Sequence, residues 1–285
     1  MLTARGRQGV TLVEITIATA TMLMVTGAIY QMLTVTQRLA RAQAQQVNVQ
    51  SSVRSAALVL ANEFRPLGAG LGPSGEESDL VSIAPTAMIY RAERGFGLLC
   101  QPASSNRIRI SGLSFSGHRD PQPARDSASV FIEGDPASTA DDSWVPAAIT
   151  GVGAGSCAGS ESPSLDLTVF PVATLEGVPA GTPVRIHELM ELRLYRSDSR
   201  SWLGMRSVSS NESIQPLSGP LRDGDGLRLD YLSGAGVPTG VRGDVRSIGI
   251  SLHGESEGTA DFGAHTGEPV AEELSTQVVL RNAIR

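Results

Sequence analysis

The feature that most constrains this chain is a long apolar segment near the N-terminus that contains a single acidic residue. From Val10 to Gln37 the only charged side chain is Glu14. At about 1.5 Å of rise per residue, a helix over this segment covers the ~30 Å hydrocarbon core of a bilayer. The sequence therefore predicts a membrane-spanning helix. A carboxylate inside such a helix costs roughly 2.5–3.5 kcal/mol on insertion scales, which indicates a functional residue whose charge has a partner.

A short basic leader precedes the apolar segment. Residues 1–9 (MLTARGRQG) contain Arg5 and Arg7 and no acidic residue, and the next positive charge is Arg38. By the positive-inside rule, this asymmetry predicts that the leader stays in the cytoplasm and that the rest of the chain lies on the other side of the membrane.

Two ordinary explanations of the apolar segment remain open. A secretory signal peptide would use residues 10–17 as its apolar region and residues 18–20 (Ala-Thr-Ala) as its cleavage site. Glu14 would then lie in the middle of that region. A plain single-span anchor explains the length of the segment but leaves Glu14 unpaired in lipid.

The sequence GVTLVE at residues 9–14 resembles the processing signal of type IV pilins and type II secretion pseudopilins. The resemblance implies that a prepilin peptidase cuts after Gly9 and methylates the new N-terminus at Val10. It also implies that Glu14, the fifth residue of the mature chain, pairs with the terminal amine of a neighbouring subunit during filament assembly. Val10 stands where phenylalanine is usual in that family.

Beyond the apolar segment, side chains at alternating steps of three and four predict a continuation of the helix. This stripe consists of Val35, Leu39, Ala42, Gln46, Val49, Val53, Ala56, Leu60 and Phe64. The spacing is typical of one face of an amphipathic helix. No proline or glycine lies between Gly27 and Pro66, so one helix is predicted over residues 10–65, with residues 10–37 in the membrane. We expect the stripe to pack against a β-rich domain, while the N-terminal half of the helix remains free for the membrane or a filament.

Residues 66–285 are long enough for one sizeable domain or two small ones, and their pattern predicts strands. The candidate strands are Val81–Tyr90, Arg107–Leu113, Ala128–Glu133, Leu165–Pro171, Val184–Tyr195, Trp202–Val208, Leu227–Leu232, Val245–His253 and Leu274–Leu280. Residues 120–125, 135–144 and 151–163 are predicted as long loops. We expect an α+β fold in which the long N-terminal α-helix packs on an antiparallel β-rich domain.

Five further segments resemble minor pilins of the PilW type, with J-type pseudopilins of type II secretion as the runner-up. They are ALVLANEFRPLGAGL (57–71), VRIHELMELRLYR (184–196), GDGLRLDYLSGAG (224–236), VRSIGISLHGES (245–256) and LSTQVVLRN (274–282). The resemblance implies a pilin-like fold and a non-enzymatic subunit of a type IV pilus assembly, incorporated through its N-terminal helix in filament initiation or at the tip. It implies prepilin peptidase, other minor and major pilins and the inner membrane as partners. The protein would be a single-pass inner-membrane protein with a periplasmic C-terminal domain, and then part of the pilus at the cell surface.

The chain has two cysteines, Cys100 and Cys157, and both follow the predicted membrane helix. In an oxidising compartment, two such cysteines usually form a disulfide. No histidine lies near either one in sequence, so a metal site made of the two thiols is not expected. A bridge would close a loop of about 56 residues and stabilise the domain by on the order of 4 kcal/mol at most.

Three patterns come close to catalytic motifs without completing them. HELME at residues 187–191 has Glu191 where a zincin helix needs its second histidine, and its neighbours are typical of a strand. GVGAG at residues 151–155 lacks the following helix of a phosphate-binding loop. GLSFSG at residues 112–117 does not have the spacing of a nucleophile elbow. We therefore expect no enzymatic activity.

Two acidic loops contain oxygen ligands of the kind that calcium prefers. One contains Asp223 and Asp225, and the other runs from Asp135 to Asp142. Neither fits the EF-hand pattern, so a simple turn is the preferred interpretation and no cofactor is expected.

The charge balance limits the partners of the mature chain. The sequence has 29 acidic residues and 23 basic residues, all arginine, and removal of the leader would leave 21 arginines. This acidic balance argues against nucleic acid as the main partner. An alternative of another class is a membrane-anchored extracellular module that binds carbohydrate or a surface, with Trp144 and Trp202 as a binding platform.

Overall fold

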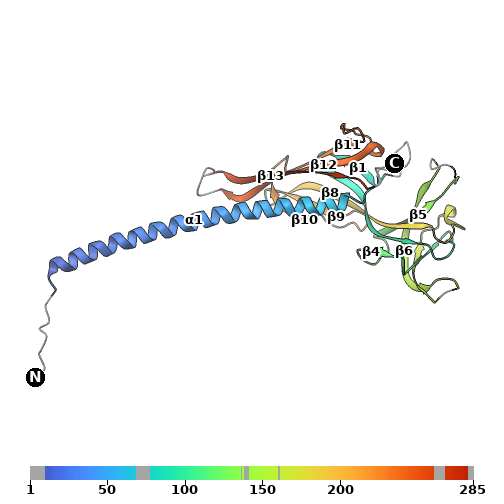
Figure 1. The fold of residues 1–285 in the computed structure, drawn as a ribbon, viewed down its shortest axis with the longest axis horizontal. Coiled ribbons are helices and arrows are strands. Elements are labelled where there is room, and N and C mark those ends of the chain that lie inside the picture. Colours follow the sequence, from blue (N-terminus) through green and yellow to red (C-terminus); the bar gives the residue numbers. More distant parts are fainter. Residues whose placement is uncertain are drawn as a thin grey trace, which may run out of the picture. The chain divides into compact units, whose positions relative to one another are not determined.

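The computed structural model describes residues 10–68, 78–135, 137, 141–159, 161–259 and 267–281, so the leader, which ends at Gly9, lies outside the described residues. One long helix, α1 (Leu12–Phe64), precedes all the strands (Figure 1). The helix begins two residues after the predicted start at residue 10 and ends one residue before the predicted end at residue 65. The protein thus has the α+β composition that its sequence predicts.

The chain divides into two compact units, and the boundary between them falls within α1. The first unit is Met1–Asn48 with Ser256–Val270, and the second is Val49–Glu255 with Ala271–Arg285. Hydrophobic burial along α1 changes at the same point. Of the stripe predicted from sequence, the five members from residue 49 onward are buried, namely Val49, Val53, Ala56, Leu60 and Phe64. The four earlier members are exposed or partly exposed, so the prediction that the stripe packs on a β-rich domain is right for its second part alone.

Thirteen strands of the described residues form one hydrogen-bonded sheet. They are β1 (Leu80–Ala84), β2 (Ala87–Leu98), β3 (Arg107–Ser111), β4 (Ser116–Gly117), β5 (Asp126–Ile132), β6 (Ser143–Ser156), β7 (Pro163–Val169), β8 (Pro183–Ser197), β9 (Arg200–Ser207), β10 (Gln215–Leu221), β11 (Leu227–Ser233), β12 (Val245–Thr259) and β13 (Pro269–Val279). The main path runs β11-β12-β10-β9-β8-β5-β6-β7-β3. Strand β2 also pairs with β8, and β13 pairs with β12.

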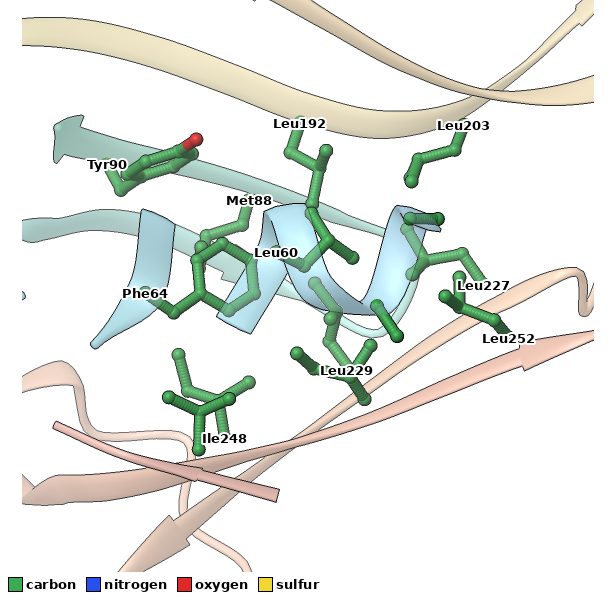
Figure 2. Close-up of a cluster of buried hydrophobic side chains, with 14 of the residues drawn as sticks. Leu60, Phe64, Met88, Tyr90, Leu192, Leu203, Leu227, Leu229, Ile248 and Leu252 are labelled. Atoms are coloured by element: carbon green, nitrogen blue, oxygen red, sulfur yellow. The ribbon is translucent and has the colours of Figure 1, made fainter. Parts of the chain in front are cut away.

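The larger core surrounds the last turns of α1. Leu60 and Phe64 are fully buried, and the Phe64 ring meets Tyr90 edge to face at a centroid distance of 5.7 Å. Figure 2 shows side chains from β2, β8 and β9 on one side of this part of the helix and side chains from β11 and β12 on another. Burial of these apolar groups is the main force that holds the second part of α1 on the sheet.

A smaller core lies under β3, β5, β6, β7 and the first half of β8. Its fully buried members include Ile108, Ile110, Val130, Leu167 and Val184. Strand β8 contributes to both cores, since Val184 and Ile186 enter the smaller one and Met190 and Leu192 enter the larger one. The alternation of buried and exposed positions along β8 is the period of two that the sequence predicts for this segment.

The structure corrects three parts of the predicted strand pattern. The candidate strand at residues 81–90 is a hairpin of β1 and β2 that turns at residues 85–86. Residues 143–156 form the long strand β6, although residues up to 144 and from 151 were predicted as loops. Strand β10 was not predicted at all, because two prolines and a glycine (QPLSGPL) are unfavourable in a strand.

Candidate functional site

The first turn of α1 is closed by reciprocal hydrogen bonds between Thr11 and Glu14. The Thr11 backbone N–H donates to Glu14 Oε2 at 2.8 Å, and the Glu14 backbone N–H donates to Thr11 Oγ1 at 3.3 Å. The Thr11 hydroxyl also lies 3.1 Å from Glu14 Oε2. With Leu12 as the first helical residue, this is a capping box with threonine at the N-cap and glutamate at the third helical position.

The capping box gives Glu14 a role within its own helix, in addition to the predicted pairing with another subunit. Its carboxylate lies at the positive end of the helix dipole and accepts two hydrogen bonds, both at Oε2. Among the described residues, no donor is bonded to Oε1. Glu14 and Val10 are both exposed in the single chain. The carboxylate can therefore cap its own helix and still accept a second donor from another molecule.

The first part of α1 exposes apolar side chains around its whole circumference. No residue of Leu12–Asn48 is buried, and the side chains that are at least half exposed include Leu12, Val13, Ile15, Ile17, Met22, Leu23, Met24, Val25, Ile29, Met32 and Leu33. A helix that is apolar on every face belongs in lipid or among other helices. By length and composition α1 can cross a membrane, as the sequence predicts.

Five threonines of this part form hydrogen bonds with carbonyl oxygens of the helix itself. The Thr16, Thr19 and Thr21 hydroxyls donate to backbone carbonyl oxygens three or four residues earlier. Thr34 and Thr36 do the same. These bonds remove the cost of unpaired hydroxyl groups in an apolar environment. Glu14 is the one charged residue between Val10 and Gln37, and Tyr30 is the only other residue of this segment with an ionisable side chain.

The two cysteines form the disulfide that the sequence predicts. Cys100 and Cys157 are bonded, with their Cα atoms 5.6 Å apart. Cys100 follows β2 and Cys157 follows β6, so the bond closes a loop of the chain that contains strands β3 to β6. Its place at the edge of the smaller core indicates a structural role.

The calcium candidates Asp223 and Asp225 are each engaged by an arginine. Asp225 accepts two bonds from the Arg222 guanidinium, while Asp223 accepts from Arg196 at 3.1 Å and from the Ser201 hydroxyl at 2.7 Å. In the other acidic loop, Asp141 and Asp142 accept backbone N–H groups. The described part of the chain contains no cluster of three or more His, Cys, Asp or Glu side chains arranged to hold a metal ion.

The two tryptophans lie far apart along the sheet. Trp144 pairs with Phe131 near the start of β8, whereas Trp202 pairs with Tyr195 near its end. At about 3.3 Å per residue, these positions are separated by roughly 35–40 Å along the strand. The register therefore does not bring them together as one platform.

A buried carboxylate at Glu188, not predicted from the sequence, is the centre of a network of arginines. Glu188 is 1% exposed and lies on the core face of β8. It accepts from Arg94 Nε at 2.9 Å and Arg119 Nη2 at 3.2 Å, and from Arg125 Nε at its other oxygen. The network continues from Arg94 to Glu63 of α1, at 3.3 Å. The signal in the sequence is a glutamate at a position where the alternation of β8 requires an apolar residue.

The pKa of Glu188 is lowered by its partners. Burial, the largest single cause, raises the pKa of this carboxyl, but the Ser207 hydroxyl and the guanidinium groups of Arg94 and Arg125 together outweigh burial and hold the pKa below its ordinary value. The group is therefore an anion at neutral pH, fixed among arginines. HELME lies within strand β8, as its neighbouring residues predict. Successive side chains of a strand point to opposite faces, so His187 lies on the other face of β8 from Glu188.

No protein-family model, curated protein or solved structure matches this chain. Its function is therefore inferred from the residues themselves and their geometry.

Proposed function

We propose that this protein is a minor pilin-like subunit of a type IV pilus assembly, which a prepilin peptidase trims after Gly9 and which joins the filament through α1. The observation that carries the proposal is the position of Glu14. It is the only charged residue in an apolar segment that can cross a membrane, it lies in the first helical turn, and it keeps one carboxylate oxygen without a described donor.

The proposed mechanism is a charge pair between subunits. After cleavage, the amine of Val10 in one subunit meets the Glu14 carboxylate of its neighbour. Two opposite charges that are buried together are far less costly than either one alone. The apolar surface of residues 12–39, exposed in the single chain, is then covered by the helices of other subunits. The large β-rich part favours a low-copy position at or near the tip.

The first test is N-terminal analysis and intact mass of the protein purified from its native membranes. A chain that starts at Val10 and is heavier by one methyl group supports the proposal. A chain that retains Met1 refutes it in favour of the anchored binding module, and a start near Thr21 indicates an ordinary secreted protein. A J-type pseudopilin would be processed in the same way. Deletion of the gene distinguishes the two: loss of pili indicates a minor pilin, and loss of protein secretion indicates a pseudopilin.

A second test separates the charge of Glu14 from its role as a cap. Glu14→Gln keeps an acceptor for the Thr11 backbone N–H but removes the charge, whereas Thr11→Val removes the capping hydroxyl and keeps the charge. We expect the Glu14→Gln protein to remain folded and membrane-held but to enter filaments poorly. Thr11→Val should weaken the helix start by about 1 kcal/mol and leave incorporation near normal. Equal defects in the two variants would mean that Glu14 acts only as a cap.

A further inference from the structure

A cavity of about 240 Å³ lies on the face of the sheet opposite the smaller core. Its walls include Arg185 and His187 of β8, which alternate along the strand with the buried Val184 and Ile186. Ser129 of β5 pairs with Arg185 on one side and with Pro146 of β6 on the other. The strand register therefore gathers polar side chains from three neighbouring strands on one outward face.

The cavity contains a buried histidine whose ring is only partly bonded. His187 is 9% exposed, and its Nδ1 lies 3.3 Å from Ser129 Oγ. Among the described residues, no group is bonded to its Nε2. Burial lowers the pKa of His187 to about 4, against the opposing effect of Asp79. The ring is therefore neutral near pH 7, and it has one donor and one acceptor nitrogen.

The two arginines of the cavity differ in their partners. Arg185 is paired with Asp79 at 2.8 Å and with Glu93 at 3.6 Å, and its guanidinium lies 5.4 Å from the centre of the Trp144 ring. Arg91 donates through Nη1 to the carbonyl oxygen of Ser78 at 2.6 Å, and no described carboxylate forms an ion pair with it. Arg91 therefore retains N–H donors and a positive charge for an anionic group.

We propose that this cavity binds a sugar acid, a monosaccharide-sized molecule that carries one carboxylate and several hydroxyl groups. Arg91 receives the carboxylate, since a guanidinium matches its two oxygens. Asp79, Ser129 and His187 exchange hydrogen bonds with the hydroxyls. Trp144 and Pro146 supply the apolar wall for the carbon face of the sugar ring. The volume lies just below the range typical of drug-sized ligands, which suits one sugar unit.

The test uses the full chain in detergent micelles with Trp202→Phe, so that Trp144 is the only tryptophan left and reports from the cavity. Sodium D-glucuronate is titrated while tryptophan emission is followed, with D-glucose and sodium sulfate as comparison probes. We expect saturable binding of glucuronate with a dissociation constant on the order of 1 mM. Glucose, which lacks the carboxylate, and sulfate, which lacks the hydroxyls and the ring, should each bind at least tenfold more weakly.

Variants then identify the residues that recognise the ligand. Arg91→Gln should weaken glucuronate binding at least tenfold, and Arg91→Lys should weaken it less while it keeps the charge. Arg228→Gln, on the exposed side of β11, is the matched control and should leave binding unchanged. Circular dichroism must show that each variant is folded. If glucuronate gives no saturable signal, if sulfate binds equally well, or if folded Arg91→Gln binds normally, the proposal is wrong.

Discussion

Replacement of Glu188 by glutamine tests whether the arginine network is a main support of the sheet. The variant keeps the shape of the side chain but leaves Arg94, Arg119 and Arg125 without the anion that joins them. Loss of one partner in a buried pair costs about 3–5 kcal/mol. The side chains of Arg94, Arg119 and Arg125 are 13%, 27% and 30% exposed, so water can replace part of the lost interaction. We therefore expect the free energy of unfolding to fall by about 3 kcal/mol, the lower end of that range.

The assay is urea unfolding of the full chain in detergent micelles, followed by tryptophan emission. With a denaturant dependence of about 2–3 kcal/mol per molar urea, the loss lowers the unfolding midpoint by about 1–1.5 M. Glu212→Gln is the matched control, because Glu212 bonds to Arg125 at the exposed end of the same network, with 40% of its side chain exposed. Glu212→Gln should lower the free energy of unfolding by less than about 1 kcal/mol. Equal midpoint shifts in the two variants would refute the reasoning.

Acidification provides an independent check on the same carboxylate. The folded-state pKa of Glu188 lies below its ordinary value, so its contribution to stability is complete above the unfolded-state pKa. That contribution is lost as the pH falls through the lower, folded-state pKa. The difference in unfolding free energy between the wild type and Glu188→Gln should therefore be constant from about pH 6 to 8 and should shrink as the pH falls below about 4. A difference that grows in acid would contradict this assignment.

The remaining predictions concern packing and the disulfide. Gly254→Ala should lower the free energy of unfolding by about 1–3 kcal/mol, because the added Cβ would clash with the Val53 side chain of α1. Gly153→Ala is the control, since a Cβ there meets no atom within 4 Å, and it should change stability by under about 0.5 kcal/mol. Equal effects of the two substitutions would contradict the packing of α1 on β12. Replacement of Cys100 and Cys157 by serine should lower the free energy of unfolding by up to about 4 kcal/mol for a loop of 57 residues. Reduction of the wild type with dithiothreitol should reproduce that loss in thermal unfolding, and an unchanged melting temperature would show that the bond is not structural.

Much of this fold follows from local patterns in the sequence. The apolar segment from Val10 and the absence of proline and glycine between Gly27 and Pro66 predict both ends of α1 to within two residues. Alternation of apolar and polar residues predicts the positions of most strands. The errors have local causes. Strand β6 contains Gly151, Gly153 and Gly155, which are typical of loops, yet its backbone pairs with β7 along that stretch. Intrinsic preference is a weak guide where neighbouring strands supply the hydrogen bonds.

The pairing of distant strands could not be predicted from local patterns. Strand β8 lies between β2 and β5 at its start, and both come much earlier in the chain. Nothing in the residues of one strand specifies its partner, because the period of two fixes which side is buried and not which strand lies beside it. The Glu188 network and the cavity at His187 both depend on that pairing. Their residues are therefore visible in the sequence, but their proximity is not.

The larger core also dictates an order of events during synthesis. The buried face of α1, from Val49 to Phe64, is completed by β11 and β12 and by Val278 and Leu280, so its last contacts come from the end of the chain. A core closed by such distant segments forms late and slowly. Until then the nascent chain exposes an apolar helix face, which is prone to aggregate. Under the proposed function, insertion of α1 into the membrane before the later strands are made would keep that face at a fixed place, away from other unfinished chains.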